Sequence, residues 1–185
     1  MLNGLIFDIS THKPKELAET AMSAAVMLLV LYEQDQFSVV ITKRSNTVET
    51  YANQYCLPGG MRDIDDDDLK LTAIREVYEE LGFNPQYYQI VGQLDDLPDR
   101  YGNVVRPFVA IMKKADFDNY SFINVDEIAE VILLQVQELK NIKPDPRMEK
   151  YTKRQPFYCY ESGDMLIWGL TAFILKQFAN LILKK

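Results

Sequence analysis

The chain has 185 residues, of which 48% are hydrophobic and 25% charged, and this ordinary globular composition excludes long disorder, collagen and coiled coil. Its 20 Lys and Arg against 27 Asp and Glu give a net charge of −7, so no nucleic-acid partner is expected. Only two cysteines are present, which excludes a disulfide framework and a cysteine-rich zinc site. No signal peptide is visible, and we expect one cytoplasmic domain over residues 1–185.

Five predicted strands follow an N-terminal extension over residues 1–21, whose only histidine, His12, is expected to be exposed. The strands are runs rich in Val, Ile, Leu and aromatic residues, and turn-forming residues separate them. In chain order they are Ala24–Tyr32, Phe37–Lys43, Tyr88–Leu94, Val104–Lys113 and Ala129–Gln135, with a hairpin connection at Glu33–Gln36 and a short extended piece at Tyr55–Leu57 that ends at Pro58-Gly59-Gly60.

One segment, Asp68–Leu81, has the clearest helical pattern. Acidic residues stand at its start, where free N–H groups and the helix dipole favour them, and Gly82 follows its end, where a left-handed cap is expected. An apolar stripe recurs along it at helical spacing, formed by Ala73, Ile74, Val77 and Leu81.

The last part of the chain is predicted to close the fold. Lys176, Gln177 and Asn180 interrupt its apolar run, so we expect an amphipathic helix that packs on the protein and crosses no membrane. Strands and helices interleave without a regular βαβ repeat, which favours an α/β fold: an α/β/α sandwich around a mixed β-sheet. The elements expected here are a helical turn at Gln137–Asn141, a hairpin over Pro156–Glu161 and Asp164–Ile167, and a closing helix at residues 165–183 with Trp168–Leu183 as its amphipathic part.

Three glutamates of the predicted helix, Glu76, Glu79 and Glu80, fall within about 100° of arc, away from the apolar stripe. Like charges at this spacing repel, so solvent, Arg75 or a divalent cation must compensate them. Carboxylate oxygens suit Mg²⁺ or Mn²⁺ better than zinc. Three such residues taken alone are more often a solvated surface. The Pro-Gly-Gly turn and acidic loop that lead into this helix favour a site instead, because they bring backbone groups to the same cleft.

The run Arg75-Glu76-Val77-Tyr78-Glu79-Glu80-Leu81-Gly82-Phe83 resembles the second half of the signature box of Nudix hydrolases, Arg-Glu-aliphatic-any-Glu-Glu-any-Gly-aliphatic. The first half departs from that box, because Asp67 stands where it has Glu and the pair Gly59-Gly60 arrives one residue early. On this resemblance the box spans residues 59–83. It implies a Nudix fold and an enzyme that hydrolyses the pyrophosphate of a nucleoside diphosphate linked to another group, with Mg²⁺ or Mn²⁺ as cofactor.

The early glycine pair is similar to the coenzyme A diphosphatase-like branch of the family. The runs Val40–Ser45 and Leu57–Gly60 look like that branch's coenzyme A motif, although Glu49 replaces its Arg and Asn53 its Gly. Coenzyme A or a derivative is therefore the first substrate candidate. A glutamate at an expected phosphate contact would repel that substrate. The alternatives are NADH, ADP-ribose or another nucleotide, or a non-catalytic nucleotide-binding domain.

The resemblance also implies roles for individual residues. Arg75, Glu76, Glu79 and Glu80 are the predicted catalytic set, with Arg75 bridging the acidic loop to the helix carboxylates. The predicted metal ligands are Glu76, Glu79, Glu80 and the carbonyl of Gly60.

Other roles stay open between candidates. Either Asp67 or Asp66 takes the place of the missing box glutamate, and the general base is Glu79, Glu127 or Glu130. The substrate-binding candidates are Arg44, Ser45 and Arg106, with surface ion pairing an equal account of both arginines. The expected partners are a nucleotide-type small molecule and, as in many family relatives, a second copy of the chain.

Overall fold

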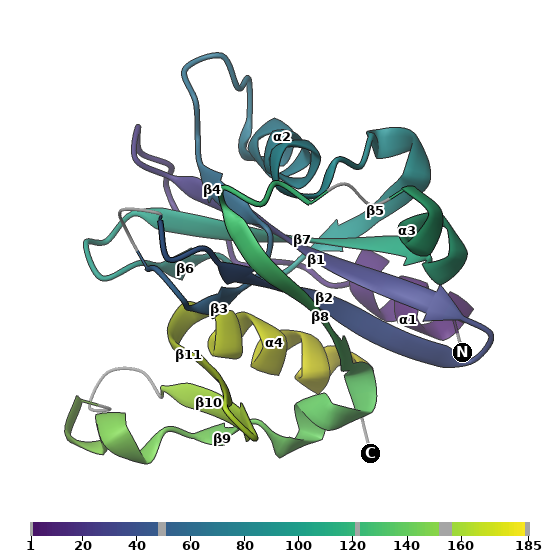
Figure 1. Cartoon of the computed structure of the whole chain (residues 1–185). Helices are drawn as coiled ribbons and strands as arrows, with labels where there is room; N and C mark the ends of the chain where they lie inside the picture. The colour runs from purple at the N-terminus through teal and green to yellow at the C-terminus, as the bar shows by residue number, and fades with distance from the viewer. Residues whose placement is uncertain (1, 48–50, 121–122, 152–156, 184–185) are drawn as a thin grey trace.

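The computed structural model describes residues 2–47, 51–120, 123–151 and 157–183 (Figure 1). Within these residues the main sheet has eight strands. In chain order they are β1 (Ala24–Glu33), β2 (Gln36–Arg44), β3 (Tyr55–Cys56), β4 (Gly59–Met61), β5 (Tyr88–Gln93), β6 (Leu97–Pro98), β7 (Val104–Lys113) and β8 (Ile128–Gln135). The five strands and the hairpin expected from the sequence are confirmed to within a few residues.

The sheet is mixed, as the sequence predicts. Its central path runs β3-β2-β1-β7-β5, and only β1 and β7 pair in parallel among the strand pairs of the described residues. β8 extends along β2, and the short β4 pairs with the start of β1, where Ala25 lies opposite Gly60. This pairing fixes the glycine turn at one end of the sheet's central strand.

The helices are α1 (Leu2–Ser10), α2 (Leu69–Leu81), α3 (Lys114–Tyr120) and α4 (Gly169–Ile182), with short 3₁₀ turns η1 (Pro85–Tyr87), η2 (Val136–Asn141) and η3 (Pro146–Tyr151). A second small sheet holds β9 (Lys143–Pro144), β10 (Tyr158–Ser162) and β11 (Met165–Trp168). The late hairpin is therefore confirmed, although Pro156 lies outside the described residues. The closing helix begins at Gly169, so the predicted start at residue 165 is wrong: residues 165–168 pair with β10. No helix among the described residues has the length and apolar composition needed to cross a bilayer.

Alternating side chains of β1 build two cores on opposite faces of the sheet. Met27 and Leu29 pack with Val77 and Leu81 of α2, whereas Leu28 packs on the side of α1 and α4. Figure 1 shows α2 on one face and α4 on the other. This alternation, expected for a strand buried on both faces, confirms the predicted α/β/α sandwich.

The N-terminal extension is more ordered than its sequence suggests. It begins with α1, for which no helix is predicted, and Ile9 packs so closely on β5 that a Cβ at Gly92 would lie 2.7 Å from its Cγ2. The expectation that His12 is exposed is wrong, because its Nε2 lies 2.9 Å from Asp95 Oδ1 and its side chain is 20% exposed. The extension therefore lies along the domain surface before β1 begins, and polar contacts such as that of His12 with Asp95 hold it there.

Candidate active site

The helix α2 begins and ends at the residues that the sequence predicts. Asp68 Oδ1 accepts a hydrogen bond from the Leu71 N–H at 2.8 Å. Gly82 adopts a left-handed conformation with φ 74°, and its N–H donates to the Tyr78 carbonyl at 2.9 Å. Val77 and Leu81 are fully buried against the sheet, so the polar side of the helix is held toward the glycine turn.

Two adjacent glycines bring that turn against the helix. Gly59 has φ 147°, and a Cβ there would lie 2.3 Å from the Ala25 carbonyl oxygen. A Cβ at Gly60 would lie 2.4 Å from Oε1 of Glu76. The Gly59 N–H also donates to Oε2 of Glu80 at 3.3 Å. Both helix carboxylates therefore meet the glycine pair directly, at distances that no larger residue permits.

These two carboxylates are buried, unlike the solvated face that charge runs usually form. Glu80 is 1% exposed, and the side chain of Glu76 is 13% exposed. Burial and, to a smaller extent, the nearby charge of Glu76 raise the pKa of Glu80 to about 8, against the opposing effect of Arg44. Burial also raises the pKa of Glu76, against the opposing effect of Arg75. The pair is thus a buried concentration of negative charge that a cation would relieve.

Arg75 is confirmed as the bridge between the acidic loop and the helix carboxylates. Its Nη1 donates to Glu76 Oε1 and to Glu79 Oε2, both at 2.9 Å. Its Nη2 donates to the Met61 carbonyl at 2.9 Å and to Asp66 Oδ2 at 3.0 Å. Of the two acids that could replace the missing box glutamate, Asp66 holds the arginine.

Asp66 itself is fixed on both sides. It is 7% exposed, and its Oδ2 also accepts the Asp63 N–H at 3.0 Å. Burial alone would raise the pKa of Asp66, but the hydrogen bonds from Arg75 and from the Asp63 backbone hold it below its usual value. Asp67 is exposed, and its carbonyl rather than its side chain takes part in the loop.

The donor set fits a divalent cation. In the described part of the chain no three Asp, Glu, His or Cys side chains are already gathered as a metal site. The cation between Glu76 and Glu79 is the Arg75 guanidinium. The cradle that a Cβ at Gly60 would fill, with two buried carboxylates beside it, nonetheless provides the oxygen donors that Mg²⁺ and Mn²⁺ prefer. Glu79, whose side chain is 47% exposed, lies at the solvent side.

The predicted substrate-binding residues lie in two places. Arg44, at the end of β2, is close enough to act electrostatically on Glu80 and on Cys56. Ser45 is buried, and its N–H donates to the Glu127 carbonyl at 2.7 Å. Arg106 on β7 belongs to a different cluster, where it binds Asp96 through Nε at 3.0 Å and Nη2 at 2.8 Å.

A loop before β8 reaches the same site, and its anchor was missed by the sequence reasoning. Asn124 donates its backbone N–H to the Glu80 carbonyl at 3.0 Å and its Nδ2 to Glu127 Oε1 at 3.2 Å. The charge of Glu127 acts on both Glu76 and Glu80. In the sequence, only the spacing of Asn124 and Glu127, three residues apart, could have indicated this contact. The third candidate base, Glu130, pairs with Lys43 at 3.9 Å.

The two departures from the coenzyme A motif have different outcomes. Glu49 lies outside the described residues. Asn53 has φ 61°, a left-handed conformation that glycine adopts freely and that asparagine tolerates better than most residues. Its N–H donates to the Arg44 carbonyl at 3.2 Å. Asn53 therefore keeps the backbone geometry that a glycine would supply.

Comparisons with known proteins agree with this geometry. A model of the NUDIX domain matches residues 22–155. An uncharacterized Nudix hydrolase, NudL, of Photorhabdus laumondii is 33% identical over 168 residues, covering 90% of this chain and 88% of the relative. The chloroplastic Nudix hydrolase 22 of Arabidopsis thaliana is 31% identical, and the match covers 87% of this chain and 56% of that relative, so the chain spans about half the plant protein.

A solved structure shares the fold. The crystal structure of a C. elegans Ap4A hydrolase binary complex matches 62% of this chain and 81% of that one, with a TM-score of 0.52 and 14% identity. The names of the relatives do not single out the coenzyme A branch. The family model covers the glycine turn, the box helix and the sheet between them, and the chain therefore belongs to the Nudix hydrolase family.

Proposed function

We propose that this Nudix hydrolase is a metal-dependent diphosphatase, and that coenzyme A or a derivative is its first substrate candidate. The observation that carries the proposal is the buried pair Glu76 and Glu80 held against Gly59 and Gly60. A structural domain gains no stability from two buried carboxylates of like charge. A metal-dependent diphosphatase needs them, because they hold the cations that neutralise the phosphate charge of its substrate.

In this proposal Glu76, Glu80 and the Gly60 backbone hold Mg²⁺ or Mn²⁺, with Glu79 as an additional ligand at the solvent side. When bound, the metal neutralises phosphate oxygens and lowers the pKa of the attacking water. Arg75 keeps Glu76 and Glu79 oriented through its hydrogen bonds. Arg44, Ser45 and Arg106 are the candidates for contact with substrate phosphates.

Glu127 is the best supported general base. It acts on the charges of Glu76 and Glu80, and Asn124 orients its carboxylate. Glu130 is exposed and pairs with Lys43, which supports a surface role for it. A base that accepts a proton from water must lie close to the site, and the action of Glu127 on Glu76 and Glu80 supports that placement. Glu79, which lies on the box helix and is bound by Arg75, is the alternative base.

The substrate choice depends on two positions. The backbone geometry of Asn53 removes one objection to coenzyme A, because the residue keeps a glycine-like φ. Glu49 remains the objection, since a carboxylate beside a phosphate raises the free energy of binding. Substitution Glu49→Arg should therefore raise kcat/KM on coenzyme A, and an unchanged or lower value would remove that argument. NADH and ADP-ribose are the alternative substrates. A cytoplasmic homodimer is the expected form of the protein.

The test is product analysis with purified protein, Mg²⁺ or Mn²⁺, and a panel of coenzyme A, NADH, ADP-ribose, diadenosine polyphosphates and nucleoside triphosphates. Cleavage of coenzyme A to 4′-phosphopantetheine and 3′,5′-ADP, lost in Glu80→Gln, supports the full proposal. Cleavage of another panel member keeps the diphosphatase and rejects coenzyme A. If no panel member is turned over with either metal, and Glu80→Gln is equally silent, the protein is a nucleotide-binding domain instead.

A further inference from the structure

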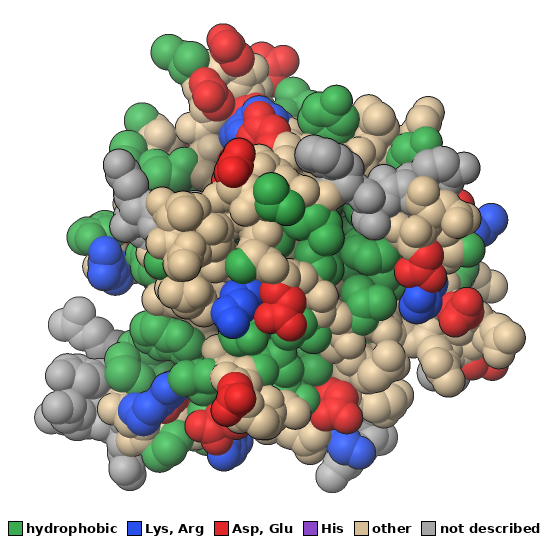
Figure 2. All heavy atoms as spheres, in the orientation of Figure 1, with side chains coloured by type: hydrophobic (Ala, Val, Ile, Leu, Met, Phe, Trp, Pro, Cys, Tyr) green, Lys and Arg blue, Asp and Glu red, His purple; other side chains and the backbone are tan. Residues whose placement is uncertain are grey.

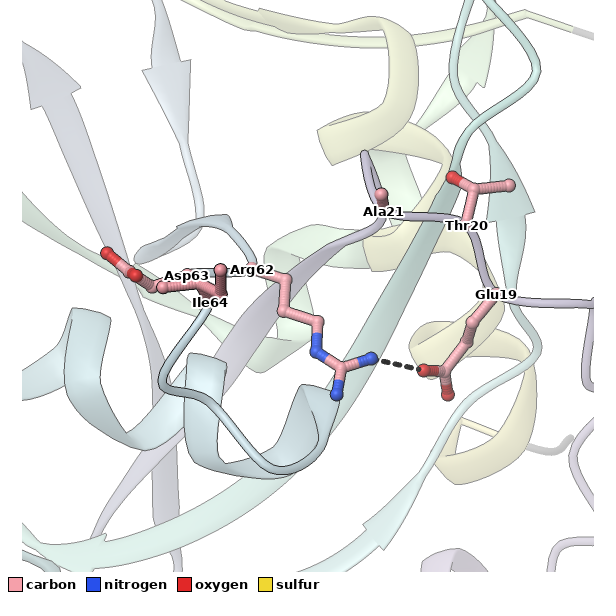
Figure 3. A pocket seen from close by; sticks show the side chains of 6 residues that line it. All are labelled: Glu19, Thr20, Ala21, Arg62, Asp63 and Ile64. Carbon is pink, nitrogen blue, oxygen red and sulfur yellow. Dashed lines mark hydrogen bonds and ion pairs between the residues drawn. The ribbon is translucent and has the colours of Figure 1, made fainter.

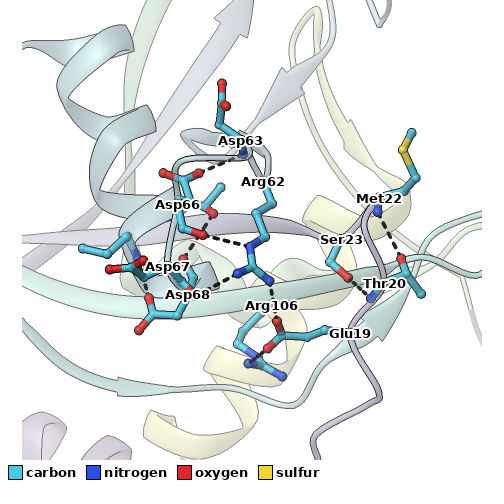
Figure 4. A network of polar contacts seen from close by, with 12 residues as sticks. Glu19, Thr20, Met22, Ser23, Arg62, Asp63, Asp66, Asp67, Asp68 and Arg106 are labelled. Atoms are coloured by element: carbon cyan, nitrogen blue, oxygen red, sulfur yellow. Dashed lines mark hydrogen bonds and ion pairs between the residues drawn. The ribbon is translucent and has the colours of Figure 1, made fainter.

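A chain of alternating charges runs from the N-terminal extension to the loop before α2, and it lies outside the Nudix box helix (Figure 4). Glu19 stands between two arginines: its Oε1 accepts from Arg106 Nη1 at 2.6 Å, and its Oε2 accepts from Arg62 Nη1 at 3.2 Å. Arg106 in turn binds Asp96, whose side chain is fully buried. Glu19 thus connects Arg62 to a fixed point in the domain.

Arg62 uses its other donors on the loop itself. Its Nε donates to the Asp66 carbonyl at 3.1 Å, and its Nη2 donates to the Asp67 carbonyl at 2.7 Å. A planar guanidinium with three fixed acceptors cannot rotate without losing at least one of them. The position of these two carbonyls therefore depends on the carboxylate of Glu19.

The loop is otherwise exposed to solvent. The side chains of Asp63, Asp65, Asp67 and Asp68 are exposed, and Figure 2 shows acidic side chains gathered at the end of the molecule where the loop projects. Like charges in a short exposed segment repel one another and destabilise a compact loop. Arg62 is the cation that holds the loop carbonyls against this repulsion.

A displacement of the loop would affect the candidate metal ligands through two sets of hydrogen bonds. Asp66 accepts three hydrogen bonds from Arg75, and Arg75 Nη1 contacts Glu76 and Glu79. Glu19 itself contacts neither carboxylate. Its influence on them passes through Arg62, Asp66 and Arg75.

The extension presents Glu19 in a fixed place. The Lys15 N–H donates to Asp95 Oδ1 at 3.0 Å, and the Leu17 N–H donates to Asp96 Oδ2 at 2.9 Å. Thr20 and Ser23 close the next turn with a hydrogen bond of 2.8 Å. Glu19 and Arg62, which are hydrogen-bonded to each other, line a cavity of about 480 Å³ together with Thr20, Ala21, Asp63 and Ile64 (Figure 3).

We infer that Glu19 is a positioning residue for the metal-binding carboxylates, acting from the N-terminal extension through Arg62 and the Asp66–Arg75 pair. The inference rests on the proposed function, since it assumes that Glu76 and Glu80 bind a divalent cation. Residues that orient metal ligands from outside the coordination shell commonly change metal affinity by about 10- to 100-fold. Glu19 acts through three further residues, Arg62, Asp66 and Arg75, so a smaller effect is expected.

The experiment measures Mn²⁺ affinity of the full chain by electron paramagnetic resonance of the free ion, without substrate. Glu19→Gln keeps the shape of the side chain and removes its charge. We expect the Mn²⁺ dissociation constant to rise on the order of 3- to 10-fold. Arg62→Met should raise it equally, and the double variant should add nothing, because both changes remove one connection. At saturating Mn²⁺ the kcat of Glu19→Gln should recover to within about 3-fold of the wild-type value.

Glu16→Gln is the matched control, because Glu16 is an exposed acid three residues earlier on the same extension and its carboxylate also acts on Arg106. It removes the same charge without touching Arg62, and its dissociation constant should stay at the wild-type value. If Arg62→Met does not fold, Arg62→Lys replaces it, since lysine keeps the charge but cannot reach three acceptors.

Three results overturn the inference while the proposed function stands. The first two are an unchanged Mn²⁺ affinity in Glu19→Gln and an equal loss in Glu16→Gln, which would reduce the effect to net charge. Additive effects in the double variant would also overturn it, because Glu19 would then act by another route. Wild-type protein that binds no Mn²⁺ overturns the proposed function itself and the inference with it.

Discussion

Two clusters of buried charge in this domain use the same residue types in different proportions. Near the start of β7, Asp96 and Glu19 alternate with Arg106 and Arg62, so each carboxylate meets a guanidinium. Beside the glycine turn, Glu80 accepts its hydrogen bond from the neutral backbone N–H of Gly59, at 3.3 Å.

The pKa values record the difference. Burial, with a smaller contribution from the charge of Glu76, raises the pKa of Glu80 to about 8. At the other cluster the hydrogen bonds that Arg106 donates to Asp96 raise the pKa of Arg106, so the ionised pair is favoured there. Balanced buried charge contributes to structure, whereas unbalanced buried charge costs stability and is kept where a ligand supplies the missing charge.

Glu80→Gln should give the largest effect and the clearest separation of activity from stability. We expect kcat to fall by at least about 10²-fold, which corresponds to about 2.7 kcal/mol in the barrier, because a metal ligand is lost. The free energy of unfolding without metal should stay equal or rise, since a carboxyl whose pKa is raised on folding costs stability at pH 7 and glutamine avoids that cost. Activity assays and urea unfolding on the same preparation test both statements.

An exposed glutamate provides the control for that substitution. Glu161→Gln, which changes a residue of β10 that pairs with Lys143 at 2.8 Å, should alter neither turnover nor metal binding. Near-wild-type turnover in Glu80→Gln would show that Glu80 is not a metal ligand. A marked loss of stability would show that Glu80, like Asp96, is a buried carboxylate that stabilises the fold.

Asp96→Asn should have the opposite profile. The substitution leaves Arg106 without its buried partner while Glu19 still holds the guanidinium, so we expect the free energy of unfolding to fall by about 2 kcal/mol. The neighbouring Asp95→Asn should cost about 0.5 kcal/mol, because that carboxylate is 39% exposed. Denaturant titration compares the two. Equal small losses would show that the Arg106 cluster contributes no more than a surface pair.

The sequence identified the site more completely than it described the site's environment. The box residues lie on one helix, so their spacing alone predicts that Glu76, Glu79 and Glu80 share a side, and the bridging role of Arg75 follows from its place beside them. Their burial could not be predicted in the same way. It depends on β4 pairing with β1, and therefore on contacts between segments that are distant in sequence.

The same reason explains the other differences. Arg106 was predicted either to meet substrate phosphates or to form an ion pair, and the sequence could not name its ion-pair partners, because Asp96 and Glu19 come from two other segments. The contacts of Asn124 and of His12 are likewise tertiary. The helix α1 owes its position to packing of Ile9 on β5 and not to a strong capping signal.

Gly60→Ala separates the function of the Glu76 and Glu80 carboxylates from the stability of the glycine turn. The new Cβ would meet the Glu76 carboxylate, which can move, so we expect kcat to fall about 10-fold with less than about 1 kcal/mol lost in stability. Gly59→Ala is the contrasting variant, because its Cβ would meet backbone atoms of Ala25 and Val26 and its φ is 147°. That change should lower stability first. If Gly60→Ala destabilises the protein as much as Gly59→Ala does, the cradle is structural.

A third charge pair, far from the box helix, extends the comparison to balanced charge at a surface. Asp145 has a buried side chain, and Arg147, 45% exposed, donates to it through Nε at 2.8 Å and Nη2 at 2.5 Å. These hydrogen bonds hold the pKa of Asp145 below its usual value. A carboxyl with a lowered pKa in the folded state contributes stability above its unfolded pKa of about 4, and loses it as the pH falls through the folded value.

Asp145→Asn should therefore cost about 1 kcal/mol at pH 7, a small value because solvent screens the exposed arginine. The difference from wild type should shrink below about pH 4 and vanish once the wild-type carboxyl is protonated. Urea unfolding of both proteins from pH 7 to pH 2.5 measures this difference. A gap that stays constant over that range would mean that the loss comes from packing and not from the ionised pair. Balanced charge would then stabilise this domain only where it is buried on both sides, as it is at Asp96 and Arg106.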